Sequence, residues 1–215
     1  MRAHVTAIVR ACFAALRQIR SVRRSLTCTT LLTLVHALVV TKVDYCSLLL
    51  SGISGQLLQR LQSVFNAVAR LVYSVRKSEH ITPLLRELHW LKVPEIIQFR
   101  LCVLAYRGLN GTTPLYLAET LHVTADVGSR RRHRSASTST LVVPSTRCTT
   151  LGDRAFPLAA ARAWNALPPS VRSAPWLLQF HRDLKTSLFQ SSSSSSPTKR
   201  LSWRLVRKLQ RHITK

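Results

Sequence analysis

Apolar residues recur at helical spacing through the first 22 residues, and arginines form a second stripe along the same segment. Steps of three or four residues place side chains on one face of an α-helix. The apolar stripe contains Val5, Ile8, Cys12, Leu16 and Ile19. The basic stripe contains Arg10, Arg17, Arg20 and Arg24. On a helical wheel the basic stripe lies largely opposite the apolar one, which predicts a helix with a core face and a cationic face.

A second helix is predicted in the uncharged run Ser25–Thr41, with Ser25 or Thr27 as its N-cap and a break near Thr41. The run holds 17 residues, five threonines and one histidine. It is therefore too short and too polar for a confident membrane span, and a buried helix is the better prediction.

A third helix is predicted after the turn residues 51–55, with Ser54 as its N-cap. Its apolar face contains Leu57, Leu58, Leu61, Val64, Phe65, Val68, Leu71 and Val72. Its polar face contains Gln59, Gln62, Ser63, Asn66 and Arg70, with no acidic residue. This helix too is expected to turn one face to the core and a polar, basic face outward.

Proline and glycine mark the elements that follow. Thr82 and Pro83 predict the N-cap and first turn of a short helix over 84–88, and a longer helix is predicted over 93–109. A short helix over 114–121 comes next. The β-prone residues 141–143, with a turn at Gly152, predict a small β-ribbon before helices over 158–166 and 176–190.

The chain therefore predicts a mainly α protein, a helical bundle with a small β-ribbon and short C-terminal helices. Five regions are expected: a helical domain over 1–122, a basic flexible loop over 123–140, the β-ribbon and helices over 141–190, a Ser-rich linker over 191–198, and a basic amphipathic helix over 199–215. The loop is assigned because arginines at 130–134 stand among serines without apolar periodicity.

The charge of the chain narrows the class of partner. Its 215 residues include 32 Lys or Arg and 8 Asp or Glu, a formal net charge of +24 at pH 7. Self-repulsion of this size calls for a counter-charge, which nucleic-acid phosphates or anionic lipid headgroups usually supply. With 46% apolar residues the chain can bury one core, or one core plus a small appendage, which excludes a multidomain enzyme.

The reactive residues form no pattern that predicts catalysis. Five cysteines lack a Cys-x-x-Cys pair, so neither a zinc site nor a disulfide framework is expected, and the thiols fit a reducing intracellular compartment, nuclear or cytoplasmic. No two of the eight acids are closer than seven residues, which argues against a two-metal centre. Phosphate-loop, nucleophile-elbow, dinucleotide-binding and zinc-protease motifs are absent. We expect no catalytic residue, no cofactor, no metal and no small-molecule substrate.

Several strings, taken in their order and spacing, resemble one family. They are Val43-Asp44-Tyr45-Cys46, Asn66-Ala67-Val68-Ala69-Arg70-Leu71-Val72, the run from His80 to Leu91 (HITPLLRELHWL), Gly152-Asp153-Arg154-Ala155-Phe156, and Trp164-Asn165-Ala166-Leu167-Pro168. Over roughly residues 1–189 the chain is similar to the C-terminal part of LINE-type non-LTR retrotransposon reverse transcriptases of the Jockey and chicken-repeat-like kind. It departs from that family at Phe65, where the family usually has Gln.

The resemblance implies that the chain follows the polymerase palm and belongs to the thumb and the region behind it. The parent would be an RNA-directed DNA polymerase, whose Tyr-x-Asp-Asp signature is missing from this chain. Residues 1–122 would then be a thumb-like domain, and the palm a partner if it is expressed with the chain. The resembling strings also contain the expected structural residues Pro83, Trp90, Gly152 and Trp164.

Charge pattern and resemblance together predict a non-catalytic fragment that grips the backbone of RNA or DNA. Sequence-independent grip needs Arg, Asn and Gln on helix faces whose other side packs into a bundle. The expected contacts are Arg10, Arg17, Arg20, Arg24, Gln62, Asn66 and Arg70. Two alternatives remain: a basic amphipathic protein that binds a membrane surface or a partner through the tail over 199–215, and a translated transposon relic with no cellular role.

Overall fold

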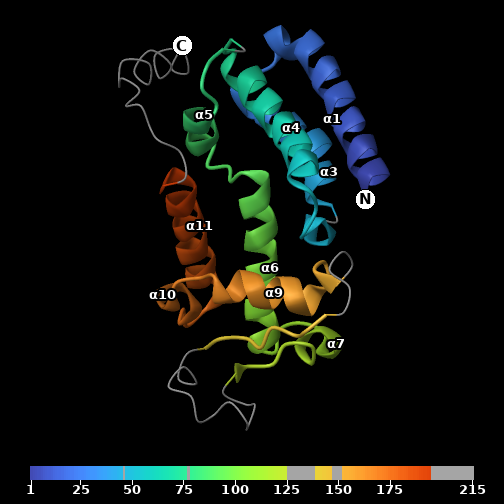
Figure 1. Ribbon diagram of the computed structural model, residues 1–215. Coiled ribbons are helices and arrows are strands. Elements are labelled where there is room, and N and C mark those ends of the chain that lie inside the picture. Colours follow the sequence, from blue (N-terminus) through green and yellow to red (C-terminus); the bar gives the residue numbers. More distant parts are fainter. Residues whose placement is uncertain (46, 77, 125–138, 147–151, 195–215) are drawn as a thin grey trace. The chain divides into compact units, whose positions relative to one another are not determined.

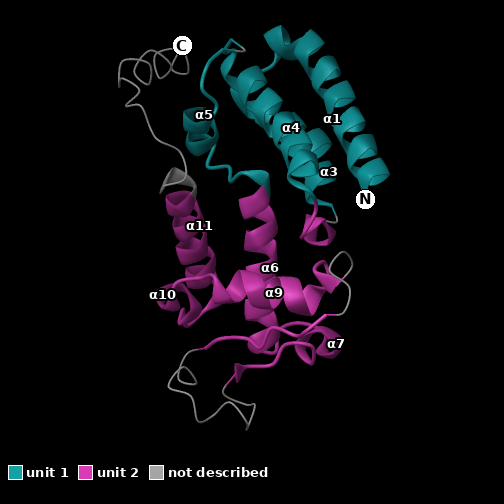
Figure 2. Ribbon diagram, viewed as in Figure 1, with its two compact units in different colours: residues 1–46, 54–93, 193–215 teal, residues 47–53, 94–192 magenta. Residues whose placement is uncertain are grey.

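Helices make up the regular structure of this computed structural model, which describes residues 1–45, 47–76, 78–124, 139–146 and 152–194 (Figure 1). The described residues form two compact units (Figure 2). The first contains residues 1–45 and 54–93, and the second contains residues 47–53 and 94–192. The mainly α class is confirmed. The division after residue 93 falls inside the helical domain that the sequence predicted over 1–122.

The first unit is a bundle built on two long helices, α1 and α4. Its elements in chain order are α1 (Arg2–Val22), the 3₁₀ turn η1 (Arg23–Ser25), α2 (Cys28–Val35), the π-helical segment η2 (His36–Val40), α3 (Thr41–Asp44), α4 (Gly55–Tyr73) and α5 (Thr82–Glu87). Helices α1 and α4 lie side by side, α2 to α3 pack against them, and α5 packs on α4 (Figure 1).

Apolar periodicity explains why α1 and α4 meet. The buried residues of α1 are Val5, Val9, Cys12, Ala15, Leu16 and Ile19. Those of α4 are Leu61, Val64, Phe65, Val68, Ala69, Leu71 and Val72. Both sets recur every three or four residues, so each helix buries one stripe and leaves the rest of its surface to solvent. The two helices follow the predicted bounds to within two residues.

The second helix begins at the predicted threonine. The Thr27 hydroxyl accepts a hydrogen bond from the Thr30 N–H at 3.2 Å, which satisfies one of the free donors at the start of α2. The chain then runs through η2 into α3 and ends there, close to the predicted break. Ser54 does precede α4, but its side chain makes no capping bond. In α5, Ile81 is the N-cap, and Thr82 is already helical, one residue later than predicted.

The second unit packs three helices around a cluster of aromatic rings. Its elements are η3 (Ser47–Leu50), α6 (Val93–Leu109, whose first residue belongs to the first unit), α7 (Leu115–Ala118), α9 (Phe156–Asn165), α10 (Pro169–Arg172) and α11 (Leu177–Ser194). Phe180 is fully buried, and the Tyr106 and Trp164 rings stack on it with centroid distances of 4.4 and 5.7 Å. Trp164 is therefore the core anchor that the sequence predicted.

The predicted β-ribbon is wrong for the described residues, where a single antiparallel bridge joins Val123 to Leu141. The backbone of Leu141 finds its other partner in a side chain. Asn165 in α9 accepts from the Leu141 N–H and donates to the Leu141 carbonyl, both at 2.8 Å. Because one amide side chain satisfies the groups that a second strand would have paired, no ladder is needed here.

The expected turn glycine has a steric role. A Cβ on Gly152 would lie 2.6 Å from the Cβ of Thr146, which leaves no room for a side chain. Helix α11 continues through Ser191 to Ser194, where the Ser-rich run predicted a linker. The rest of that linker, most of the basic loop over 123–140 and the predicted helix over 199–215 lie outside the described residues.

Candidate nucleic-acid interface

Arginines on α1 and η1 form the most basic exposed surface of the first unit. We call this set the arginine face; it consists of Arg10, Arg17, Arg20 and Arg24. All four side chains are exposed. At about 100° per residue, the three on α1 fall within an arc of about 80° on the helix. The structure therefore brings these four predicted contacts together on one face.

The arginine face adjoins the core face of α1, where the sequence placed it largely opposite. The arc of buried residues is centred about 120° from the arginines, and Arg20 lies next to buried Val9 on the helical wheel. The difference arises because Val9 and Ala15 are buried, which widens the core face beyond the predicted apolar stripe. The arginine face consequently borders the line along which α1 and α4 pack.

The guanidinium groups of the arginine face are not neutralised by the protein. None of the four has a side-chain hydrogen bond or an ion pair with another described residue, and α1 has no acidic residue in its first turn. The described part of the first unit carries twelve Lys or Arg and three Asp or Glu, a net charge of +9. A surface of uncompensated guanidinium groups is suited to phosphate oxygens, which accept from Arg in a bidentate geometry.

Helix α4 contributes a fifth arginine that the sequence reasoning missed. The exposed Arg60 donates from Nη1 to the Thr6 hydroxyl at 3.1 Å. Thr6 lies four residues before Arg10, within the same arc of α1. Arg60 was not singled out because the register between α1 and α4 is tertiary information. Its place within the basic polar face of α4 was the available signal.

Arg23 differs from its neighbour Arg24. It is half-buried, and it donates from Nε to the Leu71 carbonyl at 2.7 Å and from Nη2 to the Val72 carbonyl at 2.8 Å. These carbonyls belong to the last turn of α4, where no further helical N–H is available. Arg23 thus caps α4 from the end of α1 and holds the two helices in register.

The predicted contacts on α4 lie on a different side from α1. The Gln62 side chain accepts from the Val93 N–H at 2.8 Å and donates to the Asn66 side chain at 3.0 Å. Arg60, which reaches α1, is about 200° away from Gln62 around the helix. Gln62 and Asn66 are half-buried, as is Arg70, and the first two have an internal structural role. Contact of these three residues with nucleic acid stays a prediction.

Trp90 is held by the chain near the start of α6. Its ring packs edge to face on Phe65, with centroids 5.6 Å apart and an interplanar angle of 89°. Phe65 is the position where the chain departs from the resembled family. Pro83 is exposed at the second position of α5, where its missing N–H removes no helical bond. These residues shape the first unit and do not belong to the arginine face.

The thiols and rings with shifted pKa values belong to the packing of the two units. Burial raises the pKa of Cys102 to about 12 and also raises the pKa of Cys12. Burial, with repulsion from Glu87, raises the pKa of Tyr73 to about 12. Burial and the nearby Arg107 and Arg100 lower the pKa of His181. A raised thiol pKa disfavours the reactive thiolate, so Cys12 and Cys102 have the chemistry of core residues.

The described ranges contain no group of three His, Cys, Asp or Glu side chains arranged to hold a metal ion. Of the helices described, none has both the length and the apolar character needed to cross a bilayer. Comparison with protein-family models, with curated proteins and with solved structures gives no match for this chain. The function must therefore be argued from the arginine face and the sequence.

Proposed function

We propose that this chain is a non-catalytic nucleic-acid-binding protein that holds the sugar-phosphate backbone through the arginine face. The observation that carries the proposal is the set of exposed guanidinium groups on one side of α1 without partners among the described residues. A solvated face of mixed charge would show acids interleaved with the arginines, and α1 contains none. The net charge of +24 supplies long-range attraction to a polyanion.

The geometry supports a grip on the backbone rather than a reading of bases. Arg10 and Arg20 are ten residues apart, which is about 15 Å along the helix. Successive phosphates of one strand are about 3.4 Å apart along the axis, so this length matches about four nucleotides. Arginines in such a row neutralise phosphates and displace counterions whatever the sequence.

We further propose that the chain derives from the C-terminal end of a retrotransposon RNA-directed DNA polymerase. The support is the resemblance of its ordered strings, together with a helical bundle that has a basic exposed face. No Asp-Asp pair occurs anywhere in the chain, so the proposal gives it no polymerase activity. The genomic sequence just upstream tests the ancestry: a Tyr-x-Asp-Asp region, in frame or frameshifted, is expected within a few hundred bases.

Fluorescence anisotropy with the full chain tests the binding proposal. A labelled oligonucleotide at 50 mM salt is titrated with the wild type and with a triple variant carrying Arg10→Gln, Arg17→Gln and Arg20→Gln. The variant should bind at least about 10-fold more weakly, because three phosphate contacts are lost at low salt.

A charge-matched control separates the site from net charge. Arg107, Arg182 and Lys185 are exposed residues of the second unit, and changing all three to Gln removes the same three charges. This control should bind within about 2-fold to 3-fold of the wild type. Equal weakening in both triple variants would mean that total charge alone drives binding. No binding by the wild type at 50 mM salt would remove the proposal.

A further inference from the structure

An aromatic side chain stands in the middle of the arginine face. Phe13 is the only Phe, Tyr or Trp of α1, and on the helical wheel it lies within the arc of the arginines. Its side chain is 36% exposed, whereas Val9 and Leu16 on the same helix are 8% and 6% exposed. A phenyl ring that is not needed to close the core is therefore presented together with guanidinium groups.

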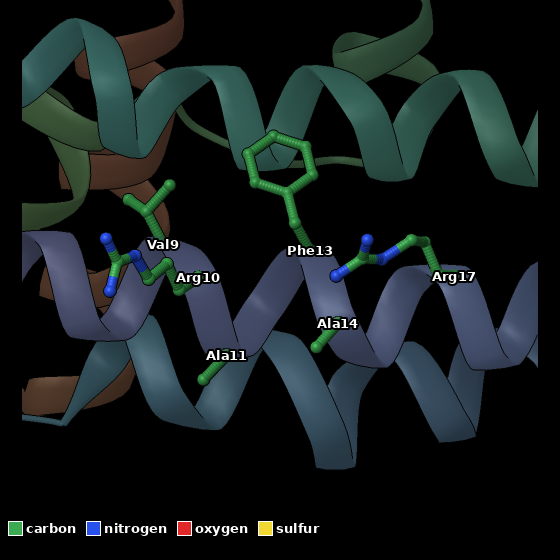
Figure 3. Close-up of a pocket in the computed structure, with 6 residues that line it drawn as sticks. All are labelled: Val9, Arg10, Ala11, Phe13, Ala14 and Arg17. Carbon is green, nitrogen blue, oxygen red and sulfur yellow. The ribbon is translucent and has the colours of Figure 1, made fainter.

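The surroundings of Phe13 form a shallow open groove. It is lined by residues of α1 alone: Val9, Arg10, Ala11, Phe13, Ala14 and Arg17. Figure 3 shows the ring pointing toward α4, with Arg10 and Arg17 on either side of it. The neighbouring alanines are small, and no aromatic ring from the described residues stacks on Phe13. One side of the ring is left available to a flat ligand.

The spacing of the three side chains matches a nucleic-acid strand. Arg10 and Arg17 are seven residues apart, about 10.5 Å along the helix, with Phe13 near the midpoint. Phosphates repeat at about 3.4 Å along a stacked strand, so the two arginines bracket about three nucleotides. Phe13 then lies level with the middle nucleotide. Charge flanking an aromatic ring is the arrangement by which proteins bind single strands, because bases stack on the ring while phosphates meet the cations.

A duplex cannot use this ring. Its base faces are covered by neighbouring pairs, and only its phosphates reach a surface from outside. We therefore propose that the groove around Phe13 binds unpaired nucleotides, with one base stacked on the Phe13 ring and the flanking phosphates held by Arg10 and Arg17. This inference rests on the proposed function and adds to it a preference for single strands, of RNA or of DNA.

The test compares four labelled probes of equal length with the full chain at 100 mM salt. They are a deoxythymidine 12-mer, a uridine 12-mer, a 12-mer of abasic deoxyribose phosphates, and a 12-base-pair duplex. Phe13→Ala should weaken binding of the two single strands by about 5-fold or more, which is the usual effect of losing one stacked base. It should leave the abasic probe and the duplex within about 2-fold of the wild type. The ratio between uridine and thymidine probes shows which sugar is preferred.

Three further variants separate stacking from packing. Phe13→Leu keeps an apolar side chain against α4 but removes the aromatic face, so it should lose single-strand affinity as Phe13→Ala does. Phe13→Trp should restore it, and emission from the new indole should be quenched by the thymidine 12-mer. Tyr116→Ala, at a 69% exposed aromatic side chain of α7, is the matched control and should change nothing.

The possible outcomes distinguish this inference from the function on which it rests. Unchanged single-strand affinity in both Phe13→Ala and Phe13→Leu, with salt-dependent binding intact, overturns the stacking role alone. Equal weakening on the abasic probe also overturns it, because no base is present to stack. If the wild type binds none of the four probes but binds vesicles of anionic lipid, both proposals are wrong and a membrane surface is the partner.

Discussion

Two adjacent arginines at the end of α1 should have opposite effects when each is replaced by alanine. Arg23 donates two hydrogen bonds, of 2.7 and 2.8 Å, to the last carbonyls of α4, whereas Arg24 is exposed and has no side-chain partner among the described residues. The two substitutions remove the same charge one residue apart. Any difference between them therefore reports local structure and not the electrostatics of the whole chain.

The magnitude follows from the bonds that Arg23 makes. A hydrogen bond from a charged donor contributes about 1.5–3 kcal/mol, and a cation at a helix C-terminus adds about 0.3–1 kcal/mol. Arg23 is half-buried, so water replaces part of this interaction when the side chain is removed. We expect Arg23→Ala to lower the free energy of unfolding by about 2 kcal/mol and Arg24→Ala to change it by less than about 0.5 kcal/mol.

Urea unfolding followed by circular dichroism at 222 nm measures this difference. With a slope of about 1–3 kcal/mol per molar urea, the midpoint of Arg23→Ala should fall by about 1 M. Arg23→Lys keeps the charge without the planar fork and should lie between the wild type and the alanine variant. In binding assays the order reverses, since Arg24→Ala should weaken oligonucleotide affinity. Equal and small losses of stability at both positions would refute the capping role of Arg23.

Three other predictions concern residues away from the arginine face. Asn165→Ala should lower the free energy of unfolding by about 2–3 kcal/mol, because the backbone of Leu141 loses both hydrogen bonds, and thermal melts against Asn165→Asp, which keeps the acceptor alone, check this. His89→Gly should raise stability by about 0.5 kcal/mol, since His89 follows α5 with φ at +54°, and an equal or lower urea midpoint would contradict it. Cys102, whose pKa is raised to about 12 by burial, should resist a thiol reagent at pH 9 while the exposed Cys28 reacts. Since the pKa of an unfolded cysteine is about 8.5, the stability from keeping Cys102 protonated is complete below that pH and is lost as pH rises toward 12. Mass spectrometry of labelled peptides reads this out, and fast labelling of native Cys102 would show that it is not buried.

Local sequence signals were sufficient for most helices. Thr27 caps α2, Ser54 precedes α4, and Gly111 follows α6 with φ at +67°. These features were predictable because caps and left-handed turns depend on residues close in the chain. The exposed position of the arginine face was predictable for the same reason, since the spacing of charges along one helix fixes which residues share a face.

Contacts between distant residues were not predictable. Asn165 replaces a strand partner of Leu141, 24 residues away, so the β-prone segment forms no ribbon among the described residues. Gln62 was predicted to face a ligand, but its carbonyl accepts from Val93, 31 residues later. Pattern alone cannot show which polar side chains are needed to satisfy backbone groups elsewhere in the fold.

The salt dependence of binding tests the central claim most directly. The logarithm of the association constant is plotted against the logarithm of salt concentration for the thymidine 12-mer, with the full chain and with the Arg10, Arg17 and Arg20 triple Gln variant. Each lost phosphate contact on a single strand should reduce the steepness of this line by about 0.7, so the variant should be shallower by about 2. An unchanged slope would show that the arginine face does not touch phosphate.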